Sequence, residues 1–173
     1  GELNGLKTSY RKGGSVISKE NYKNNILDGL FESYGETGSK KKKLTYKSGK
    51  IDGLAYDYYN NNNVSRETIY KDGVKLSHIT YSYFNSLDDE GNPNLRHIIN
   101  YSKIDGYEYR HGDSESYYEN GQLQEKSIYI KNNKNGLFES YFNDGQLKVK
   151  ANYIKDTKNG LEETFFDTGA IAS

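Results

Sequence analysis

The side chains best suited to catalysis or metal binding gather in one stretch of the sequence. All three histidines, His78, His97 and His111, lie in or beside residues 74–112. An imidazole can serve as a general base or as a metal ligand. However, the histidines form no closely spaced ligand pair, no serine has the surroundings of a nucleophile, and cysteine is absent. We therefore assign neither a catalytic residue nor a zinc site, and we expect that the chain is not an enzyme.

An acidic run, Asp88, Asp89 and Glu90, lies in the same stretch. Because hard cations prefer oxygen ligands, these three residues are the metal-binding candidates of the chain, with Ca²⁺ as the ion. Their spacing matches no calcium loop that we recognise, and a solvated loop is the favoured interpretation. We therefore expect no bound metal and no cofactor.

Four consecutive lysines, Lys40, Lys41, Lys42 and Lys43, are suited to contact phosphate or an acidic protein. On a strand their side chains alternate between faces, so they cannot form one dense patch, and we interpret them as solvated charge. The 173 residues include 24 basic and 24 acidic side chains, a net charge of zero. That balance argues against a nucleic-acid or anionic-membrane surface. No segment approaches the roughly 20 apolar residues of a membrane span.

A 24-residue repeat organises the chain and must position these side chains. Segments 28–34 and 135–141 are identical at six of seven positions. An aromatic residue stands five positions after the first glycine of each unit, and a tyrosine stands 17 positions after five of these glycines. The glycines recur in steps of 24 on either side of an irregular stretch, at Gly5, Gly29, Gly53, Gly112, Gly136 and Gly160. We count about seven units, the last one cut short.

Each unit predicts two short strands and two tight turns. Asn143-Asp144-Gly145 and Glu119-Asn120-Gly121 indicate hairpin turns whose two central residues adopt positive φ, and residues 60–63 indicate a longer turn. No segment shows sustained helical periodicity. We therefore predict an all-β fold, an elongated single-layer antiparallel β-hairpin repeat array. Residues 1–173 would form one repeat domain.

The central unit, at about 74–112, departs from the strict period. Residues 85–94 lengthen a turn that elsewhere needs about four residues, and 105–112 add a second insertion. Insertions in repeat proteins often lie on the binding face. We expect this unit to give the binding surface its specificity.

The turns fix a pairing register. With Asp144 and Gly145 at the centre of one turn, Phe142 faces Leu147. A second turn centred on 156–157 connects the next pair of strands. A one-residue slip would move every side chain to the other face of the sheet, so this register can be tested residue by residue.

The same register predicts a row of alternating charge across neighbouring strands. Each facing pair of opposite charges contributes roughly 0.2–1 kcal/mol, and each glutamate has a cation beside it, so the row is interpreted as structural and not as a catalytic carboxylate cluster. Its members face one another as Glu32 with Lys43, Glu115 with Lys126, Glu139 with Lys150, and Lys150 with Glu163.

Regularly spaced aromatic residues are the candidates for partner binding. Such residues can stack on sugars or hold an extended peptide, although filling the same structural slot in every hairpin is the simpler interpretation for most of them. The candidates are Tyr34, Tyr58, Tyr59, Tyr83, Phe84, Tyr107, Tyr109, Tyr117, Tyr118, Tyr141 and Phe142.

The repeat resembles a known family. Residues 136–148, Gly-Leu-Phe-Glu-Ser-Tyr-Phe-Asn-Asp-Gly-Gln-Leu-Lys, followed by Tyr153 and by Asn159-Gly160-Leu161, are similar to the bacterial variant of the MORN (membrane occupation and recognition nexus) repeat. The resemblance covers most of the chain and weakens between about 74 and 112. It implies an elongated single sheet of hairpins without enzymatic activity, used as a scaffold or binding surface. Many bacterial proteins of this variant are classed as antitoxin or immunity components, and others are exported.

Three functions are consistent with these features. The first is a non-catalytic scaffold that binds another protein, or a second copy of itself, through its aromatic and charged face. The second is an antitoxin or immunity protein that neutralises a bacterial toxin. The third is an exported protein that binds carbohydrate or cell wall.

The ends of the sequence do not identify the cellular compartment of the protein. Methionine is absent, including at position 1, and residues 1–4 look like the tail of a repeat. We expect that the chain begins downstream of its natural start, at a removed export signal or at a cloning boundary. A bacterial protein, either exported to the cell surface or cytoplasmic, fits the sequence.

Overall fold

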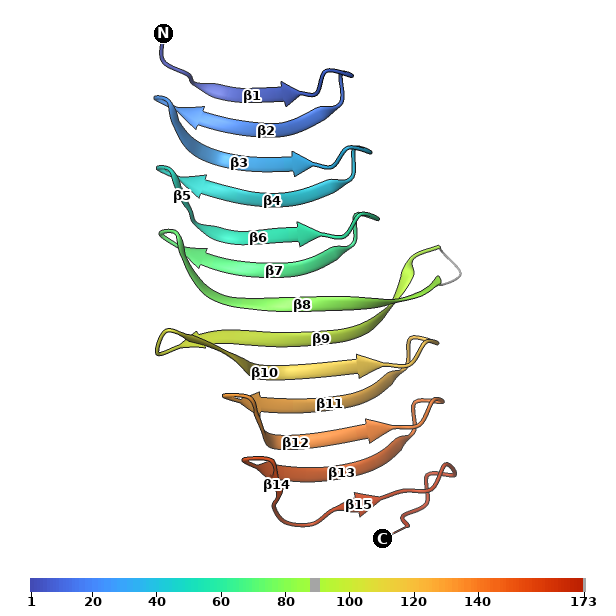
Figure 1. Ribbon diagram of the computed structural model, residues 1–173. Coiled ribbons are helices and arrows are strands. Elements are labelled where there is room, and N and C mark those ends of the chain that lie inside the picture. Colours follow the sequence, from blue (N-terminus) through green and yellow to red (C-terminus); the bar gives the residue numbers. More distant parts are fainter. Residues whose placement is uncertain (88–90, 173) are drawn as a thin grey trace. The chain divides into compact units, whose positions relative to one another are not determined.

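The computed structural model describes residues 1–87 and 91–172, and this part of the chain consists of strands and turns without a helix (Figure 1). The strands form one open antiparallel sheet in which nearly every strand pairs with the next along the chain. The predicted all-β hairpin array is therefore confirmed. The chain divides into two compact units, residues 1–78 and 79–173.

The first unit contains three hairpins. Its strands are β1 (Gly5–Tyr10), β2 (Val16–Lys23), β3 (Ile26–Tyr34), β4 (Lys40–Lys47), β5 (Lys50–Ile51), β6 (Gly53–Tyr58) and β7 (Val64–Lys71). The short β5 pairs with β4 ahead of β6.

The second unit repeats this plan after a pair of longer strands. The strand β8 (Val74–Leu87) begins in the first unit and ends in the second. The remaining strands are β9 (Pro93–Ile104), β10 (Tyr107–Tyr117), β11 (Leu123–Ile130), β12 (Asn133–Tyr141), β13 (Leu147–Ile154), β14 (Thr157–Lys158) and β15 (Glu163–Thr164).

One kind of hairpin loop has three residues and one positive φ. In the loop 143–145, Gly145 has φ 87° while Asn143 and Asp144 do not adopt positive φ. This is a type I turn closed by a glycine bulge, and the Asp144 carboxylate accepts the Gln146 N–H at 3.0 Å. The prediction of a two-residue turn at these Asx-Gly sites was wrong. Because of the bulge, Leu147 faces Tyr141 and not Phe142.

The same loop closes six hairpins. The residue before each loop, called the anchor position below, donates its N–H to the carbonyl of the residue after the loop at 2.7–2.8 Å. Residues 60–62 form one of these loops, with Asn62 at φ 67° in place of glycine, so the longer turn predicted there was wrong. The anchor positions are Arg11, Gly35, Tyr59, Tyr118, Phe142 and Phe166.

The other kind of turn has two residues, both with positive φ, as a type I′ turn requires. One such turn is Lys155-Asp156, where Ile154 faces Thr157. The predicted centre at 156–157 was one residue late. The other turns of this kind are Asn24-Asn25, Ser48-Gly49, Asp72-Gly73, Asp105-Gly106 and Lys131-Asn132.

A bulge follows several of these two-residue turns, and a side chain beside the bulge caps the turn that comes next along the chain. Gly136, with φ 121°, interrupts the ladder between β11 and β12. In the second hairpin of the first unit, the residue before the glycine, Asp28, accepts the N–H of Ser48 at 3.0 Å, and Ser48 begins the next two-residue turn. In the same way, Asn4 accepts the N–H of Asn24, and Asp52 accepts the N–H of Asp72. The Asx residues before four of the unit glycines, Asn4, Asp28, Asp52 and Asn135, therefore cap the next two-residue turn.

The buried residues lie on one face, called the core face. Among the described residues, the buried apolar side chains are Leu44, Ala55, Tyr129 and Ala151. Leu44 faces Phe31 and Ala151 faces Phe138, the residues two positions after the unit glycines of their hairpins. Phe31 also meets Tyr46 edge to face at 6.0 Å, and Phe138 meets Tyr153 at 5.7 Å. Large aromatics therefore pack beside small or aliphatic partners.

The irregular stretch contains the longest strands among the described residues, β8 with 14 residues and β9 with 12. Asp105 and Gly106 form a two-residue turn, and residues 107–110 continue the ladder against β9. The insertion predicted at 105–112 is thus mostly strand. The proline, Pro93, begins β9, the first position of a strand, where a missing N–H is tolerated.

His111 is the exception to the turn caps. It precedes the unit glycine Gly112, where the other hairpins carry Asn or Asp, and its Nδ1 atom is buried without a hydrogen-bond partner. We predict that His111→Asn raises the free energy of unfolding of the second unit by about 1 kcal/mol, because an amide oxygen can cap the turn at Lys131. Urea denaturation measures the change, and slower amide exchange at Lys131 reports the new bond.

The reverse change serves as the control. Asp28→His removes a cap in the first unit and should lower its free energy of unfolding by about the same amount. Two results together would contradict this account of the cap. His111→Asn would gain neither stability nor protection from amide exchange, and Asp28→His would lose no stability.

Candidate functional site

The charge row lies across the sheet as the register predicts. Glu115 faces Lys126, Lys126 faces Glu139, and Glu139 faces Lys150, which in turn faces Glu163. The Lys126 Nζ–Glu115 Oε1 distance is 3.2 Å, and the Lys150 Nζ–Glu139 Oε1 distance is 3.9 Å. These cross-strand positions are confirmed, including the last one, because the bulge at Gly160 offsets the error in the turn.

The first unit carries its own part of the row. Glu32 faces Lys43 on one side, as predicted, and Lys19 on the other. The face that carries Glu32, Lys43, Glu115, Lys126, Glu139, Lys150 and Glu163 is called the charge face below. It lies opposite the core face, because neighbouring residues in a strand alternate.

Tyrosines on the charge face are tied to the glutamates two residues before them. Tyr34 donates its hydroxyl proton to Glu32 at 2.9 Å, and Tyr141 donates to Glu139 at 2.9 Å. Burial and then the neighbouring glutamate raise the pKa of both hydroxyls. In the third hairpin Tyr56 stands in the glutamate slot, and its ring stacks on that of Tyr58 at 6.2 Å. These tyrosines are held in place by their own strand.

The strongest of these pairs is Tyr117 with Glu115, at 2.6 Å. The Tyr117 hydrogen bond, followed by Lys126, lowers the pKa of Glu115 against the opposing effect of burial. Burial, followed by the Glu115 carboxylate, raises the pKa of Tyr117. Both shifts favour the pair in which Tyr117 keeps its proton and Glu115 is ionised.

Of the candidate aromatics at the anchor position, Tyr118 bridges neighbouring hairpins. Tyr118 donates its hydroxyl proton to the carbonyl of Tyr141 at 2.9 Å. The ring of Phe142 lies 5.4 Å from Lys148 Nζ. Tyr59 occupies the same position in the first unit and is exposed.

The aromatic candidates of the irregular stretch lie on two strands, Tyr83 and Phe84 on β8 and Tyr107 and Tyr109 on β10. Phe84 follows Tyr83 on β8, and its ring lies 5.5 Å from the Arg96 guanidinium. Tyr109 lies 5.8 Å from Lys131 Nζ. Tyr107, beside the turn at 105–106, is 70% exposed. Only Tyr107 of these four presents a largely free side chain.

The histidines have separate surroundings. His78 is buried. Ser82 Oγ lies 3.0 Å from His97 Nδ1, and burial, followed by Arg96 and Arg110, lowers the pKa of His97. In the part of the chain that the structure describes, no three His, Cys, Asp or Glu side chains are grouped to hold a metal ion. The candidates Asp88, Asp89 and Glu90 lie outside the described residues.

The lysine run is dispersed as predicted. Lys42 pairs with Asp57 at 2.7 Å, Lys40 lies 6.0 Å from the ring of Tyr58, and Lys41 bonds to the Asn60 side chain. Lys43 belongs to the charge row.

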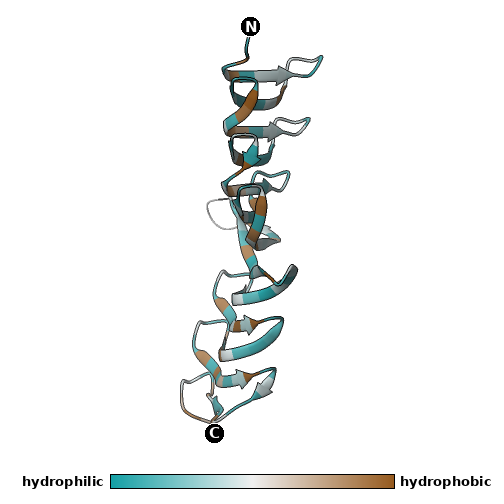
Figure 2. Cartoon of the chain, turned by 90° about the vertical axis from the view of Figure 1, so that its left-hand side faces the viewer, coloured by the Kyte–Doolittle hydropathy of each residue, from teal (hydrophilic) through white to brown (hydrophobic). Residues whose placement is uncertain are grey.

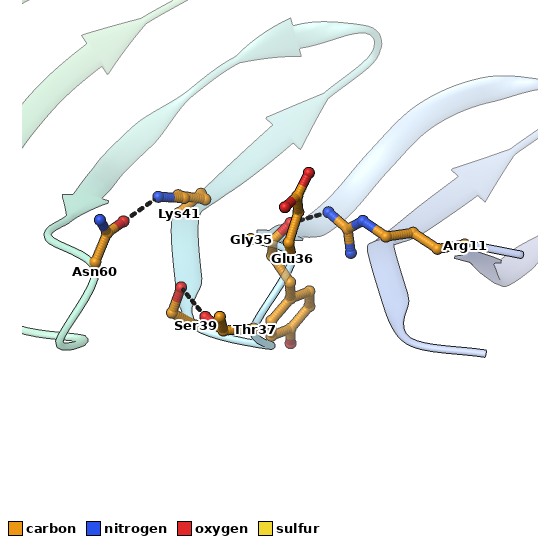
Figure 3. Close-up of a pocket in the computed structure, with 8 residues that line it drawn as sticks. Arg11, Gly35, Glu36, Thr37, Ser39, Lys41 and Asn60 are labelled. Carbon is orange, nitrogen blue, oxygen red and sulfur yellow. Dashed lines mark hydrogen bonds between the residues drawn. The ribbon is translucent and has the colours of Figure 1, made fainter. Parts of the chain in front are cut away.

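Two hollows were not predicted from the sequence. One, of about 550 Å³, lies beside Gly35 among the loops of the first unit (Figure 3). The other, of about 270 Å³, lies in the second unit beside Arg110, whose guanidinium covers the ring of Tyr129 at 3.6 Å. The signal for the first was a glycine at an anchor position, visible once the repeats are aligned loop by loop.

Four segments match the family model described as the MORN repeat variant, at residues 27–48, 51–72, 110–131 and 134–155. Together they cover about half of the chain. The chain belongs to the MORN repeat variant family. Each matched segment begins two residues before a unit glycine and ends on the first residue of a two-residue turn. One MORN segment is thus one bulge, one three-residue loop and the strands between them.

No match falls within residues 73–109, as the weakening resemblance predicts. A comparison with curated proteins finds no match. MORN repeats generally mediate binding to proteins or membranes, which is consistent with a repeat scaffold. No helix in residues 1–87 and 91–172 has the length and hydrophobicity needed to cross a bilayer.

The Tyr117–Glu115 pair predicts a pH-dependent effect. A carboxyl whose pKa is lowered by folding stabilises the protein above its unfolded pKa, about 4.3, and loses this contribution as the pH falls through the folded pKa. Tyr117→Phe removes the largest cause of that shift. We predict a loss of about 1 kcal/mol in the free energy of unfolding at pH 7, measured in urea, and a smaller loss at pH 3.

Tyr10→Phe provides a matched control. Tyr10 occupies the same slot of its hairpin, but Thr8 stands at the position that Glu115 holds beside Tyr117. Tyr10→Phe should lower the free energy of unfolding by the same small amount at pH 7 and at pH 3. A Tyr117→Phe deficit that does not change with pH would refute the proposed coupling.

Proposed function

We propose that this MORN repeat protein is a non-catalytic scaffold that binds another protein through its charge face. One observation carries the proposal: aliphatic side chains on this face remain exposed in successive hairpins. Leu6 is 62% exposed, Leu30 is 39% exposed and Leu54 is 40% exposed. Ile69, which faces Leu54 across the strands, is exposed as well. These four residues are called the aliphatic column below.

The aliphatic column occupies one position of the repeat. Leu30 and Glu32 are two residues apart on β3, so they share a face, and Tyr34 continues the same series. Each hairpin of the first unit therefore offers an aliphatic, a central and an aromatic side chain in the same order. Figure 2 shows hydrophobic segments recurring among hydrophilic ones in successive hairpins. Recurring exposed apolar side chains are a feature of protein interaction surfaces.

The electrostatics suit a protein partner. Opposite charges in the row face one another, so the charge face does not present a single sign, and the chain has no net charge. A nucleic acid or anionic membrane would need an excess of cations. Apolar contact flanked by alternating charges instead favours a partner with its own apolar residues and mixed charges.

The surroundings of the tyrosines favour protein over carbohydrate as the ligand. Sugar stacking needs an open ring face, but Lys19 lies 5.9 Å from the ring of Tyr34, and Lys40 lies 6.0 Å from that of Tyr58. The hydroxyl of Tyr34 is already bonded to Glu32. A bacterial toxin is the narrower form of the protein-partner proposal, and a toxin gene beside the gene of this chain would support it.

Serine substitutions in the aliphatic column test the proposal. The variant Leu6→Ser/Leu30→Ser/Leu54→Ser should lose at least tenfold in affinity for the partner identified by crosslinking from the native source, since each leucine buried in a complex contributes about 1.5–3 kcal/mol. It should remain folded at the temperature of the binding assay with a Tm lowered by several degrees, because Leu30 and Leu54, 39% and 40% exposed, lose the packing of their covered part. Isothermal titration calorimetry measures the affinity.

The matched control replaces exposed apolar residues outside the aliphatic column. Leu87 and Ile171 are 62% and 68% exposed, and Leu87→Ser/Ile171→Ser should bind with unchanged affinity. Equal affinity for the column variant and the native chain would refute the charge face as the binding surface. Binding of a glycan with affinity comparable to that of any protein partner would support the carbohydrate alternative instead.

A further inference from the structure

One hairpin lacks a side chain that every other three-residue loop provides. The anchor position carries Arg11, Tyr59, Tyr118, Phe142 or Phe166, but in the second hairpin it is Gly35. The backbone does not require this glycine, because its φ lies outside the positive range and its loop has the same hydrogen bonds as the others. The backbone conformation therefore does not account for the missing side chain.

The other hairpins show what an anchor side chain does. Tyr118 donates to the carbonyl of Tyr141, which is the aromatic position of the next hairpin, at 2.9 Å. Arg11 Nη2 donates to the carbonyl of Tyr34, the equivalent residue, also at 2.9 Å. An anchor side chain thus reaches across to the next hairpin. Gly35 has none to offer to Tyr58, which holds that position in the third hairpin.

Lys41 lies beside the place where a side chain of residue 35 would be. Lys148 stands six residues after Phe142, and its Nζ lies 5.4 Å from the centre of that ring. Lys41 stands six residues after Gly35, and its Cε lies only 3.0 Å from where a Cβ on Gly35 would be. Lys41 therefore has the position of a cation that covers an anchor ring, but no ring lies beneath it; it bonds to Asn60 instead.

The result is a hollow of about 550 Å³, within the roughly 300–1,000 Å³ typical of ligand sites. Figure 3 shows Arg11 on one side and Lys41 with Asn60 on the other, with Gly35 and Ser39 between them. Two cations and one carboxylate, Glu36, line it. The two cations favour the electron-rich face of an aromatic ring.

We propose that this hollow is a binding site for a tyrosine side chain of a partner protein, which supplies the anchor residue that the second hairpin lacks. The ring lies under Lys41, as Phe142 lies under Lys148. The phenol donates to the carbonyl of Tyr58, as Tyr118 does to that of Tyr141. The proposal rests on the proposed function in one respect only, that the natural ligand belongs to a protein.

A small probe tests the site without any partner. Titration of the ¹⁵N-labelled full chain with N-acetyl-tyrosinamide should shift the backbone amide signals of Gly35, Ser39 and Asn60 in a saturable way. N-acetyl-phenylalaninamide should bind roughly 2- to 10-fold more weakly, because it lacks the hydroxyl that donates to Tyr58. No saturable shift with the tyrosine probe, or equal binding of both probes, would overturn the proposal.

Two variants provide the matched controls. Gly35→Tyr with Ser39→Ala fills the hollow from within and should abolish the shifts; Ser39 is changed because its Oγ lies 2.8 Å from the new Cβ, and Ala170 already accompanies Phe166 in the equivalent pair. Tyr118→Gly vacates an anchor position in the second unit and should create new probe-induced shifts at Gln122. Probe binding that persists in the filled variant would refute the site, even if Tyr118→Gly fails to fold.

The two proposals fail separately. Loss of partner binding in the aliphatic-column variant, with the probe still bound beside Gly35, supports the charge face alone. In another outcome, the filled Gly35 variant keeps full affinity for the partner while the probe binds only the native chain. The hollow would then accept a tyrosine that this partner does not supply. That result would overturn the assignment of the ligand to the partner protein.

Discussion

A single layer of sheet must be specified largely by its backbone. The described residues bury few apolar side chains, and those that are buried, such as Leu44 and Ala151, lie on one face. A sheet of this kind gains little from a core, so stability comes from contacts between neighbouring repeats. The pairing register then depends on two features. The turns have one backbone geometry, and a one-residue shift of a strand would separate the side chains that face each other. The hairpin of β12 and β13 carries such devices at both ends: positive φ at Gly145 and Lys155, and the side chains of Asp144 and Asn135, which accept the N–H groups of Gln146 and Lys155.

The same constraint explains which parts of the fold could be predicted. The charge row depends on residues in the middle of strands, where alternation is strict, and its facing positions follow from the repeat. The turns were harder because an acidic or amide residue followed by glycine has three uses here. Asp144-Gly145 belongs to a three-residue loop, Asp72-Gly73 is a two-residue turn, and Asp28-Gly29 is a bulge. The dipeptide is the same in each case, and only its place within the 24-residue unit decides its conformation.

The candidate site was predictable to the extent that it repeats. Tyr34 and Tyr141 lie where alternation puts them, but their hydroxyl bonds to Glu32 and Glu139 require side-chain geometry that spacing alone does not give. The hollow beside Gly35 was missed because glycine in a turn-rich sequence is read as a turn residue. This glycine has no turn role, and its effect is visible only by comparison with Tyr118 and Phe142 in equivalent loops.

Deviations from the repeat therefore differ in their consequences, and the structure separates them. Asn62 replaces a loop glycine, keeps its positive φ and adds a hydrogen bond, because its side-chain oxygen accepts the N–H of Lys40 at 2.6 Å. Tyr56 replaces a glutamate and exchanges a hydrogen bond for a stacked ring. His111 replaces a turn cap and leaves a buried nitrogen without a partner, a net cost to the fold. Gly35 alone removes a side chain and leaves accessible space lined by cations. A change that preserves backbone geometry while opening space costs packing, and an incoming group that restores the missing contact would recover it.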